Sequence, residues 1–222
     1  NITGVISITP SLNGCTGLPE SYTVTVKPTP VVTFTDISVC PGDVVPNLTL
    51  TPVPAAATIA WSTPALPDIG LPTTSGTNLI PSFTALNQML VAQTNIITLN
   101  VSGNGCNGPT TTFSITVNSD PKAKFKYSSA CDGNKTNFTD ESFPGSSPIT
   151  QWNWNFGNGT STAAHPSFLL TPVGMHTVSL EVVTAAGCKS DTTETVYINP
   201  SATVDFFADS VGCTTLNTSF IN

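Results

Sequence analysis

The sequence is poor in charge. Only 9% of its 222 residues are Asp, Glu, Lys or Arg, and six of them are basic. Such a chain offers no basic surface that would attract phosphates, so we expect neither nucleic acid nor anionic lipid as a partner. No apolar run approaches the roughly 20 residues that a membrane helix needs, so we expect no membrane span in this stretch. Hydrophobic residues still make up 39% of the chain, which is enough to fill packed cores.

Residues that carry catalytic chemistry are scarce as well. There are two histidines: His165 lies in an Ala-Ala-His-Pro loop without an acidic neighbour, and His176 falls on the predicted inward face of a strand. Nucleophilic catalysis needs a base beside the nucleophile. The adjacent Asp140 and Glu141 would point to opposite faces of a strand, not flank a cleft. We therefore predict that the chain is not an enzyme and has no catalytic residues.

The six cysteines include no CxxC pair. With only two histidines, this argues against zinc and for an oxidising compartment. We expect an extracellular or cell-surface protein without a cofactor. Calcium, which prefers clustered oxygen ligands, is the alternative, at the turns 40–43 and 132–134. The sequence begins inside a strand-and-loop segment, so we expect its export signal to lie upstream.

Two kinds of cysteine alternate along the chain. The first kind follows a glycine and comprises Cys15, Cys106 and Cys188. The second kind follows a short apolar stretch and comprises Cys40, Cys131 and Cys213. The interval from a first-kind cysteine to the next second-kind cysteine is constant, because 40−15, 131−106 and 213−188 all equal 25. This regularity indicates an internal repeat of roughly 80 to 90 residues.

Each 25-residue interval contains a strand, a proline and another strand. The prolines mark repeat boundaries, where a missing N–H costs nothing, and they are Pro30, Pro121 and Pro200. We predict that residues 1–28 are the last strands of one repeat and that 29–119 and 120–199 are whole repeats. Residues 200–222 would be the first strands of another. The partners that we expect first are neighbouring repeats of the same, longer chain, which would complete the cores of the two partial repeats.

Alternating apolar and polar residues predict half-buried strands throughout both whole repeats. Trp61 follows Cys40 by the same 21 positions (61−40) that separate Trp152 from Cys131 (152−131), so the two tryptophans have matching places. The predicted core residues include Trp61, Trp152, Trp154, Phe156, Val178 and Leu180. Short alternating strands separated by turns predict an all-β fold of tandem immunoglobulin-like sandwiches arranged end to end.

Residues 121–199 resemble the PKD (polycystic kidney disease) domain family. The similarity lies in the stretches Trp154–Gly159, His165–Phe168 and Gly174–Leu180. Two aspartates of the family's turn are asparagine here, at Asn155 and Asn158, and this weakens any carboxylate or calcium role at that turn. The resemblance implies a PKD-type β-sandwich, an architecture that these changes leave intact.

Residues 29–119 are similar to the PKD-like or Ig-like repeats of very long surface proteins of Bacteroidota. Shared features are the Cys-Pro-Gly-Asp at Cys40 and the Asn-Gly-Cys at Cys106. This resemblance implies a giant adhesin of the gliding-motility type, exported by the type IX secretion system. Asp191-Thr192-Thr193 and Asp209-Ser210-Val211 resemble the O-glycosylation pattern of that group, which makes Thr192 and Ser210 candidate glycosylation sites.

Three functions compete on these grounds. The leading one is a stiff, disulfide-supported stalk for adhesion or gliding, and the alternative is an accessory PKD module of a secreted polysaccharide- or protein-degrading enzyme. A third is direct adhesion to surface glycans or other cells through loops such as 64–77. That loop is long and apolar enough to bind a ligand, although packing on its own sandwich is the simpler role.

The simplest disulfide pairing is within repeats, namely Cys40–Cys106 and Cys131–Cys188. Cys15 and Cys213 would then have partners outside this stretch. Against this pairing, the corners before the second and the last strand of an immunoglobulin-like sandwich lie at opposite ends, whereas a disulfide needs Cα atoms within about 7 Å. A bridge from one repeat to the next, Cys40–Cys188, is the alternative.

Overall fold

The computed structural model describes residues 1–128 and 130–205. The chain divides into two compact units. The first contains residues 1–120 together with the short loops 145–148 and 185–188, and the second contains 121–144, 149–184 and the residues from 189 onward. Every regular element in the described residues is a strand, so the chain has the predicted all-β fold of tandem β-sandwich domains. None of these residues forms a helix with the length and hydropathy that crossing a bilayer requires.

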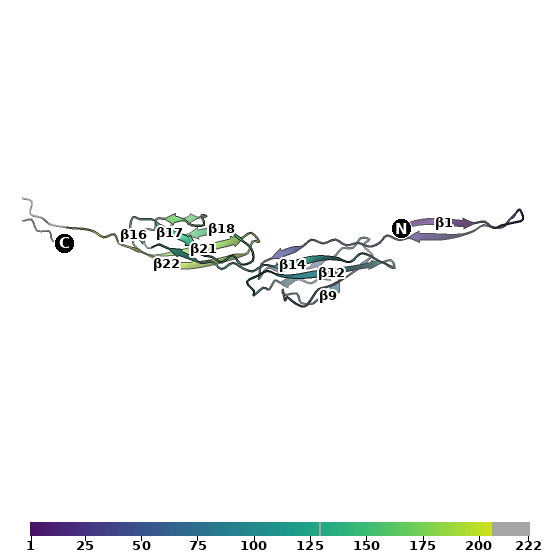
Figure 1. The fold of residues 1–222 in the computed structure, drawn as a ribbon, viewed down its shortest axis with the longest axis horizontal. Coiled ribbons are helices and arrows are strands. Elements are labelled where there is room, and N and C mark those ends of the chain that lie inside the picture. Colours follow the sequence, from purple (N-terminus) through teal and green to yellow (C-terminus); the bar gives the residue numbers. More distant parts are fainter. Residues whose placement is uncertain (129, 206–222) are drawn as a thin grey trace, which may run out of the picture. The chain divides into compact units, whose positions relative to one another are not determined.

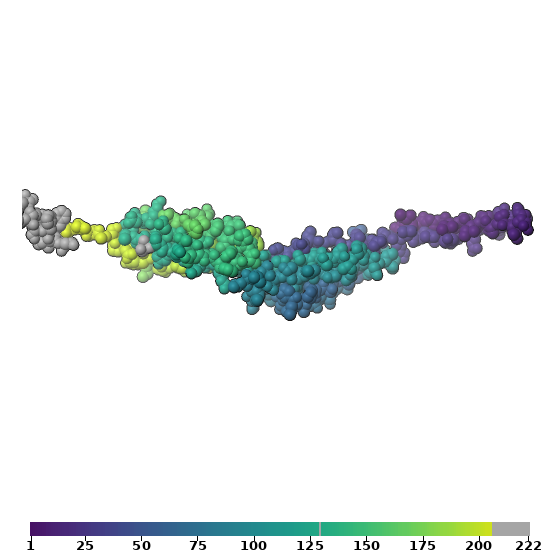
Figure 2. Space-filling view, in the orientation of Figure 1, coloured from purple at the N-terminus to yellow at the C-terminus, as the bar shows by residue number. Residues whose placement is uncertain are grey.

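The first 28 residues form a long antiparallel hairpin. Its arms are β1 (Ile2–Ile8) and β4 (Glu20–Val26), and its tip holds β2 (Ser11–Leu12) and β3 (Cys15–Thr16). The hairpin, purple in Figure 2, is exposed at every residue. A two-stranded ribbon has no second layer on which to bury its apolar side chains, so Ile2 and Val5 remain in solvent.

A two-layered sandwich follows the hairpin. Its larger sheet has the strand order β5-β14-β12-β8-β9, and β13 pairs with β12; β14, β12 and β9 are labelled in Figure 1. The bounds are β5 (Ile37–Val39), β8 (Thr58–Ser62), β9 (Ser75–Thr77), β12 (Gln93–Gly103), β13 (Cys106–Asn107) and β14 (Thr111–Val117). Two short pairs supply the other strands: β6 (Val44–Val45) with β11 (Phe83–Thr84), and β7 (Leu48–Thr49) with β10 (Leu79–Ile80).

The alternating pattern of these strands places one side of each in the core. In β12, Ile97, Leu99 and Val101 are buried while the residues between them are less so. Trp61 of β8 is 2% exposed, and its indole N–H donates to the carbonyl oxygen of Leu79 at 2.8 Å. Burying a tryptophan between two sheets contributes a large apolar area, and the hydrogen bond satisfies its one polar group.

A second sandwich is built from the remaining strands. One sheet has the order β16-β22-β21-β18-β19 and the other β15-β17-β20. The bounds are β15 (Phe125–Tyr127), β16 (Ala130–Cys131), β17 (Thr136–Asp140), β18 (Ile149–Asn155), β19 (Thr160–Ser161), β20 (Ser167–Phe168), β21 (Gly174–Thr184) and β22 (Lys189–Asn199). The long antiparallel pair β21–β22 is visible in Figure 1.

Aromatic rings fill the centre of the second sandwich. Phe125, Phe138, Trp154 and Phe156 are each no more than 2% exposed. Phe138 lies 5.6 Å from Trp154 and 5.0 Å from Phe156, measured between ring centroids. Spacings of this size are typical of favourable aromatic pairs, so the cluster adds specific contacts to the area that it buries.

The two sandwiches share one arrangement of their terminal strands. In the first, β5 pairs parallel with β14, and Val39 lies opposite Val117. In the second, β16 pairs parallel with β22, and Cys131 lies opposite Asn199. The first-strand segments at Cys40 and at Cys131 therefore each run beside the last strand of their own sandwich, in the same direction.

Candidate functional site: the Cys40–Cys188 disulfide

A disulfide joins Cys40 to Cys188 across a sequence separation of 148, with Cα atoms 5.4 Å apart. The structure therefore holds the alternative pair, and the predicted pairs Cys40–Cys106 and Cys131–Cys188 are wrong. The register of the terminal strands in each sandwich explains why.

In the first sandwich the two cysteines lie at opposite ends of β14. Cys40 follows β5, whose last residue, Val39, is level with Val117 at the end of β14. Cys106 is the first residue of β13 and precedes β14, which begins only at Thr111. The seven residues of β14 span about 20 Å, far beyond the reach of a disulfide.

The second sandwich separates its cysteines in the same way. Cys131 is level with Asn199, the last residue of β22, whereas Cys188 immediately precedes Lys189, the first. Eleven extended residues cover about 34 Å, so these two cysteines cannot pair without unfolding the sheet.

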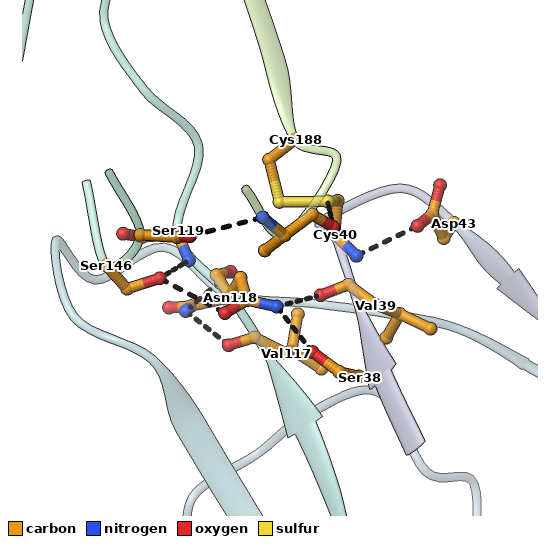
Figure 3. Close-up of a disulfide and its surroundings, with 12 residues drawn as sticks. Ser38, Val39, Cys40, Asp43, Val117, Asn118, Ser119, Ser146 and Cys188 are labelled. Atoms are coloured by element: carbon orange, nitrogen blue, oxygen red, sulfur yellow. Dashed lines mark hydrogen bonds between the residues drawn. A yellow bond between two sulfur atoms is a disulfide. The ribbon is translucent and has the colours of Figure 1, made fainter. Parts of the chain in front are cut away.

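A tight turn presents Cys40 to its partner (Figure 3). The N–H of Cys40 donates to the Oδ2 of Asp43 at 2.8 Å, and the N–H of Asp43 donates back to the carbonyl oxygen of Cys40 at 3.1 Å. Gly42, the third residue of this turn, has a φ of 85°. A left-handed third position favours glycine strongly, so the Cys-Pro-Gly-Asp sequence is suited to this turn.

A polar cluster, in which Asn118 and Ser119 are buried, lies beside the bridge (Figure 3). The side-chain amide of Asn118 donates to the Oγ of Ser38 at 2.8 Å and to the carbonyl oxygen of Val39 at 3.1 Å. The N–H of Ser119 donates to the Oγ of Ser146 at 2.9 Å. Asn118 and Ser119 are 8% and 2% exposed. Because buried polar groups are costly when unpaired, these bonds hold the residues around Cys40 in one arrangement.

Loop 145–148, which carries Ser146, lies against the end of the first sandwich. A Cβ on Gly145 would come within 2.8 Å of the backbone oxygens of Ser119 and Asp120, and the φ of Gly145 is 71°. Both features require glycine at this position. No pattern in the sequence predicts this cluster, because Asn, Ser and Gly are frequent throughout the turns of this chain.

The electrostatics near the bridge are set by two acidic residues. Burial raises the pKa of Asp120 above its ordinary value, and the nearby charge of Asp43 raises it further. Both effects disfavour the ionised carboxylate, so Asp120 is a mild source of repulsion at neutral pH.

The predicted core residues lie in both sandwiches. Trp154 and Phe156 are 1% exposed, and Val178 and Leu180 are fully buried. Trp152 differs: it is only partly buried against the core, and its indole N–H donates to the Oδ2 of Asp140 at 2.7 Å. Because Trp152 is only partly buried, its indole N–H can reach this polar partner.

The two histidines serve as local hydrogen-bond partners. The Nδ1 of His165 accepts the backbone N–H of Asp140 at 3.1 Å. The Nε2 of His176 is 2.6 Å from the carbonyl oxygen of Pro172. Among residues 1–128 and 130–205 no group of three or more His, Cys, Asp or Glu side chains could hold a metal ion. The carboxylate of Asp43 is bound within its own turn, and the calcium alternative stays a prediction.

The loop 64–77 packs partly on its own sandwich. Ile69 is 1% exposed, and Leu71 packs against the same core. Beside the loop is a shallow pocket of about 290 Å³ lined by Pro67, Asp68, Leu86, Asn87, Gln88, Met89 and Gln93.

The remaining predicted sites are distributed as follows. Thr192 is half-buried in β22 opposite Leu180, and its glycosylation stays a prediction. Ser210 and Cys213 lie outside the described residues. Cys15, Cys106 and Cys131 form no disulfide in the described part of the chain.

Fold and bridge together define the class: tandem β-sandwiches with a disulfide between cysteines of two successive sequence repeats. A family model described as PKD domain matches residues 118–199. PKD domains occur in extracellular or secreted proteins, and PKD and immunoglobulin-like domains are typically non-catalytic. The comparison with curated proteins finds no match.

Several solved structures are similar to the chain. The PKD1 domain of Vibrio anguillarum Epp is 29% identical, over 38% of this chain and 99% of its own, with a TM-score of 0.35. The PKD1 domain of the Vibrio cholerae metalloprotease PrtV is 27% identical, over 36% of this chain and 98% of its own, with a TM-score of 0.33. The N-terminal eight Ig domains of Down Syndrome Cell Adhesion Molecule are 13% identical, over 89% of this chain and 31% of theirs, with a TM-score of 0.46.

Proposed function

We propose that this chain is a tension-bearing spacer segment of a long cell-surface adhesin, in which disulfides limit how far the repeats extend under force. The observation that carries the proposal is the bridge between Cys40 and Cys188, which encloses most of both sandwiches in one covalent loop. In this function the partners are neighbouring repeats, and surface glycans or other cells are bound elsewhere in the protein.

The bridge shortens the covalent path between the ends of the chain. Tension then runs through residues 1–40, crosses the disulfide and continues from residue 188, so the intervening residues carry none of it. A chain extends by at most about 3.3–3.6 Å per residue, so a separation of 148 residues removes about 500 Å of possible extension.

Strand order resists extension in molecules whose bridge is reduced, because tension then passes through β14 and β16, which lie inside the covalent loop. β5 and β14 are a parallel pair, and they lie near the start and the end of the chain segment that forms this sandwich. Pulling that start and end apart therefore slides one strand along the other. Such shear loads all the hydrogen bonds between the two strands together, whereas pulling the two arms of a hairpin apart breaks its hydrogen bonds one at a time. The same holds for β16 and β22.

The test is single-molecule force extension of the 222-residue chain held at its two ends. We expect the oxidised protein to stop about 500 Å short of the contour length of the reduced protein. Cys40→Ser should extend fully without reductant, and Cys106→Ser, the matched control, should behave as the unaltered chain does. Equal extensions with and without reductant would sink the proposal.

The adhesin assignment rests on the resemblance of residues 29–119 to Bacteroidota surface repeats, and type IX export belongs to the same proposal. An antibody raised against the chain should label intact cells of the source organism and should lose that labelling when type IX secretion is disabled. Labelling only after the cells are opened would contradict surface display.

A further inference from the structure

We propose that Cys131 and Cys106 are half-cystines of a continuous disulfide ladder. In this ladder each second-kind cysteine bonds the first-kind cysteine of the following repeat. Cys40–Cys188 is one rung. Cys131 would bond the turn cysteine of the repeat that follows residues 120–199, and Cys106 would bond the second-kind cysteine of the repeat that precedes residues 29–119. This inference rests on the repeat array of the proposed function.

The first argument is that Cys131 occupies the position of Cys40. Each cysteine comes at the end of a strand segment that runs parallel to the last strand of its sandwich. Each begins a turn in which the N–H three residues on donates to the cysteine carbonyl, from Asp43 at 3.1 Å and from Asn134 at 3.0 Å. The third residue of each turn is a glycine with positive φ, 85° at Gly42 and 81° at Gly133.

The second argument is that Cys106 and Cys188 share a position. Along the chain, each follows a long strand, β12 or β21, and precedes that strand's antiparallel partner. Each also comes directly after a glycine of positive φ, Gly105 at 77° and Gly187 at 89°. The connections differ in length, since residues 104–110, which include β13, join β12 to β14, while the shorter loop 185–188 joins β21 to β22. In both sandwiches the cysteine precedes the last strand.

Geometry excludes the pairing that would use these cysteines within their own repeats. The last strand separates Cys106 from Cys40 and Cys131 from Cys188, as described above. Cys131 is exposed and Cys106 is partly exposed, so both thiols can meet an outside partner. The equivalents of Cys131 and Cys106 are Cys40 and Cys188, which are bonded to each other. The expected partner of each is therefore the cysteine at the matching turn of an adjacent repeat.

Forming such a rung is an oxidation that needs an exchanging disulfide, supplied by a thiol–disulfide oxidoreductase or an oxidised small thiol. The Cys131 thiolate attacks one sulfur of that disulfide and releases a thiol, and the partner thiolate then displaces the second. The two cysteines lose two protons and two electrons in forming the S–S bond, and the exchanging disulfide is reduced to two thiols.

The chain's own sequence allows a direct test. Residues 1–199 are joined to a second copy of residues 30–199, so that Pro30 of the second copy takes the place of Pro200. After oxidation in a glutathione buffer, unreacted thiols are alkylated, and non-reducing peptide mass spectrometry identifies the linked cysteines. The ladder predicts Cys40–Cys188 within each copy and Cys131 of the first copy bonded to Cys106 of the second.

Matched variants decide the outcome. Cys106→Ser in the second copy should abolish the Cys131–Cys106 linked peptide, whereas Cys106→Ser in the first copy should leave that peptide present. The Cys40–Cys188 pair in each copy reports that the repeats have folded. With those pairs present, the absence of a Cys131–Cys106 linked peptide, or Cys131 bonded elsewhere, would overturn the ladder. Such a result would leave the force-extension test of the spacer function untouched.

Discussion

Gly76 lies against the buried indole of Trp61. A Cβ at this position would stand 2.7 Å from the indole nitrogen and 3.0 Å from Cε2, and Trp61 is only 2% exposed and so cannot move aside. We expect Gly76→Ala to lower the free energy of unfolding of the first sandwich by about 1–3 kcal/mol, the usual cost of overpacking. Urea denaturation monitored by tryptophan fluorescence measures this. Gly4→Ala, where a Cβ meets nothing within 4 Å, is the control, and equal effects of both variants would contradict the explanation.

Asp120 should make stability fall as pH rises. Its pKa is raised, by burial first and then by Asp43, so the folded state binds the proton more tightly than the unfolded state. The ionised form is therefore disfavoured above the ordinary value of 3.8, and protonation at lower pH removes the penalty. We expect Asp120→Asn to stabilise the protein at pH 7 by about 0.3 kcal/mol. The effect is small because Asp120 is still largely exposed, so solvent screens its charge.

Thermal unfolding at two pH values checks this. The benefit of Asp120→Asn should be present at pH 7 and absent near pH 2.5, where the carboxyl is protonated in both states. A benefit of equal size at both values would show that shape, and not charge, is responsible. Asp68→Asn, at an exposed loop position elsewhere in the same sandwich, is the control for a general loss of negative charge.

At the scale of the element, the parallel pair β5–β14 is held in register by a side chain. The Oδ1 of Asp36 accepts the backbone N–H of Ser114 at 2.7 Å, and this hydrogen bond lowers the pKa of Asp36. A lowered acid pKa means that the stabilisation is present above the ordinary value of 3.8 and is lost as pH falls through the folded value. The pairing should therefore weaken in acid.

Amide hydrogen exchange at Ser114 and Thr116 reports this pairing. Asp36→Ala should speed exchange at Ser114 several-fold, whereas Asp36→Asn, which keeps an acceptor oxygen, should have a smaller effect. Lowering the pH below 3.8 should weaken protection at Ser114 in the unaltered protein more than in Asp36→Asn, after correction for the intrinsic rate. Unchanged protection in Asp36→Ala would show that the strand ladder alone holds the register.

The strands could be predicted from the sequence because their signal is local. Alternation at residues such as Ile97, Leu99 and Val101 indicates a strand with one buried face, wherever its partners lie. Strand pairing carries no such signal, and whether β5 lies beside β14 or beside another strand decides which end of the sandwich holds Cys40. The equal spacing of the cysteines therefore predicted a repeat but left the disulfide pairing open.

At the scale of the whole molecule, the ladder gives the constant 25-residue interval a mechanical meaning. A path that crosses the rung from Cys40 to Cys188 next follows 25 residues to Cys213, since 213−188 equals 25. Those residues extend to at most about 90 Å, whereas the 173 residues from Cys40 to Cys213 (213−40) would extend to about 600 Å without the rung. The interval between cysteines therefore sets the limit of extension, and the rest of each repeat is free to vary in length.

The same bridge should stabilise the folded chain by restricting the unfolded one. Loop-closure entropy for a separation of 148 residues amounts to about 5 kcal/mol at 25 °C. We expect the double variant Cys40→Ser/Cys188→Ser to lower the summed free energy of unfolding of the two sandwiches by up to that amount, measured by urea denaturation without reductant. Cys106→Ser and Cys131→Ser should cost far less, because neither thiol is bridged in the described chain. Adding reductant should bring the unaltered protein to the level of the double variant and should leave the double variant unchanged. If reductant shifted both equally, the stabilisation would have to come from something other than the Cys40–Cys188 bond.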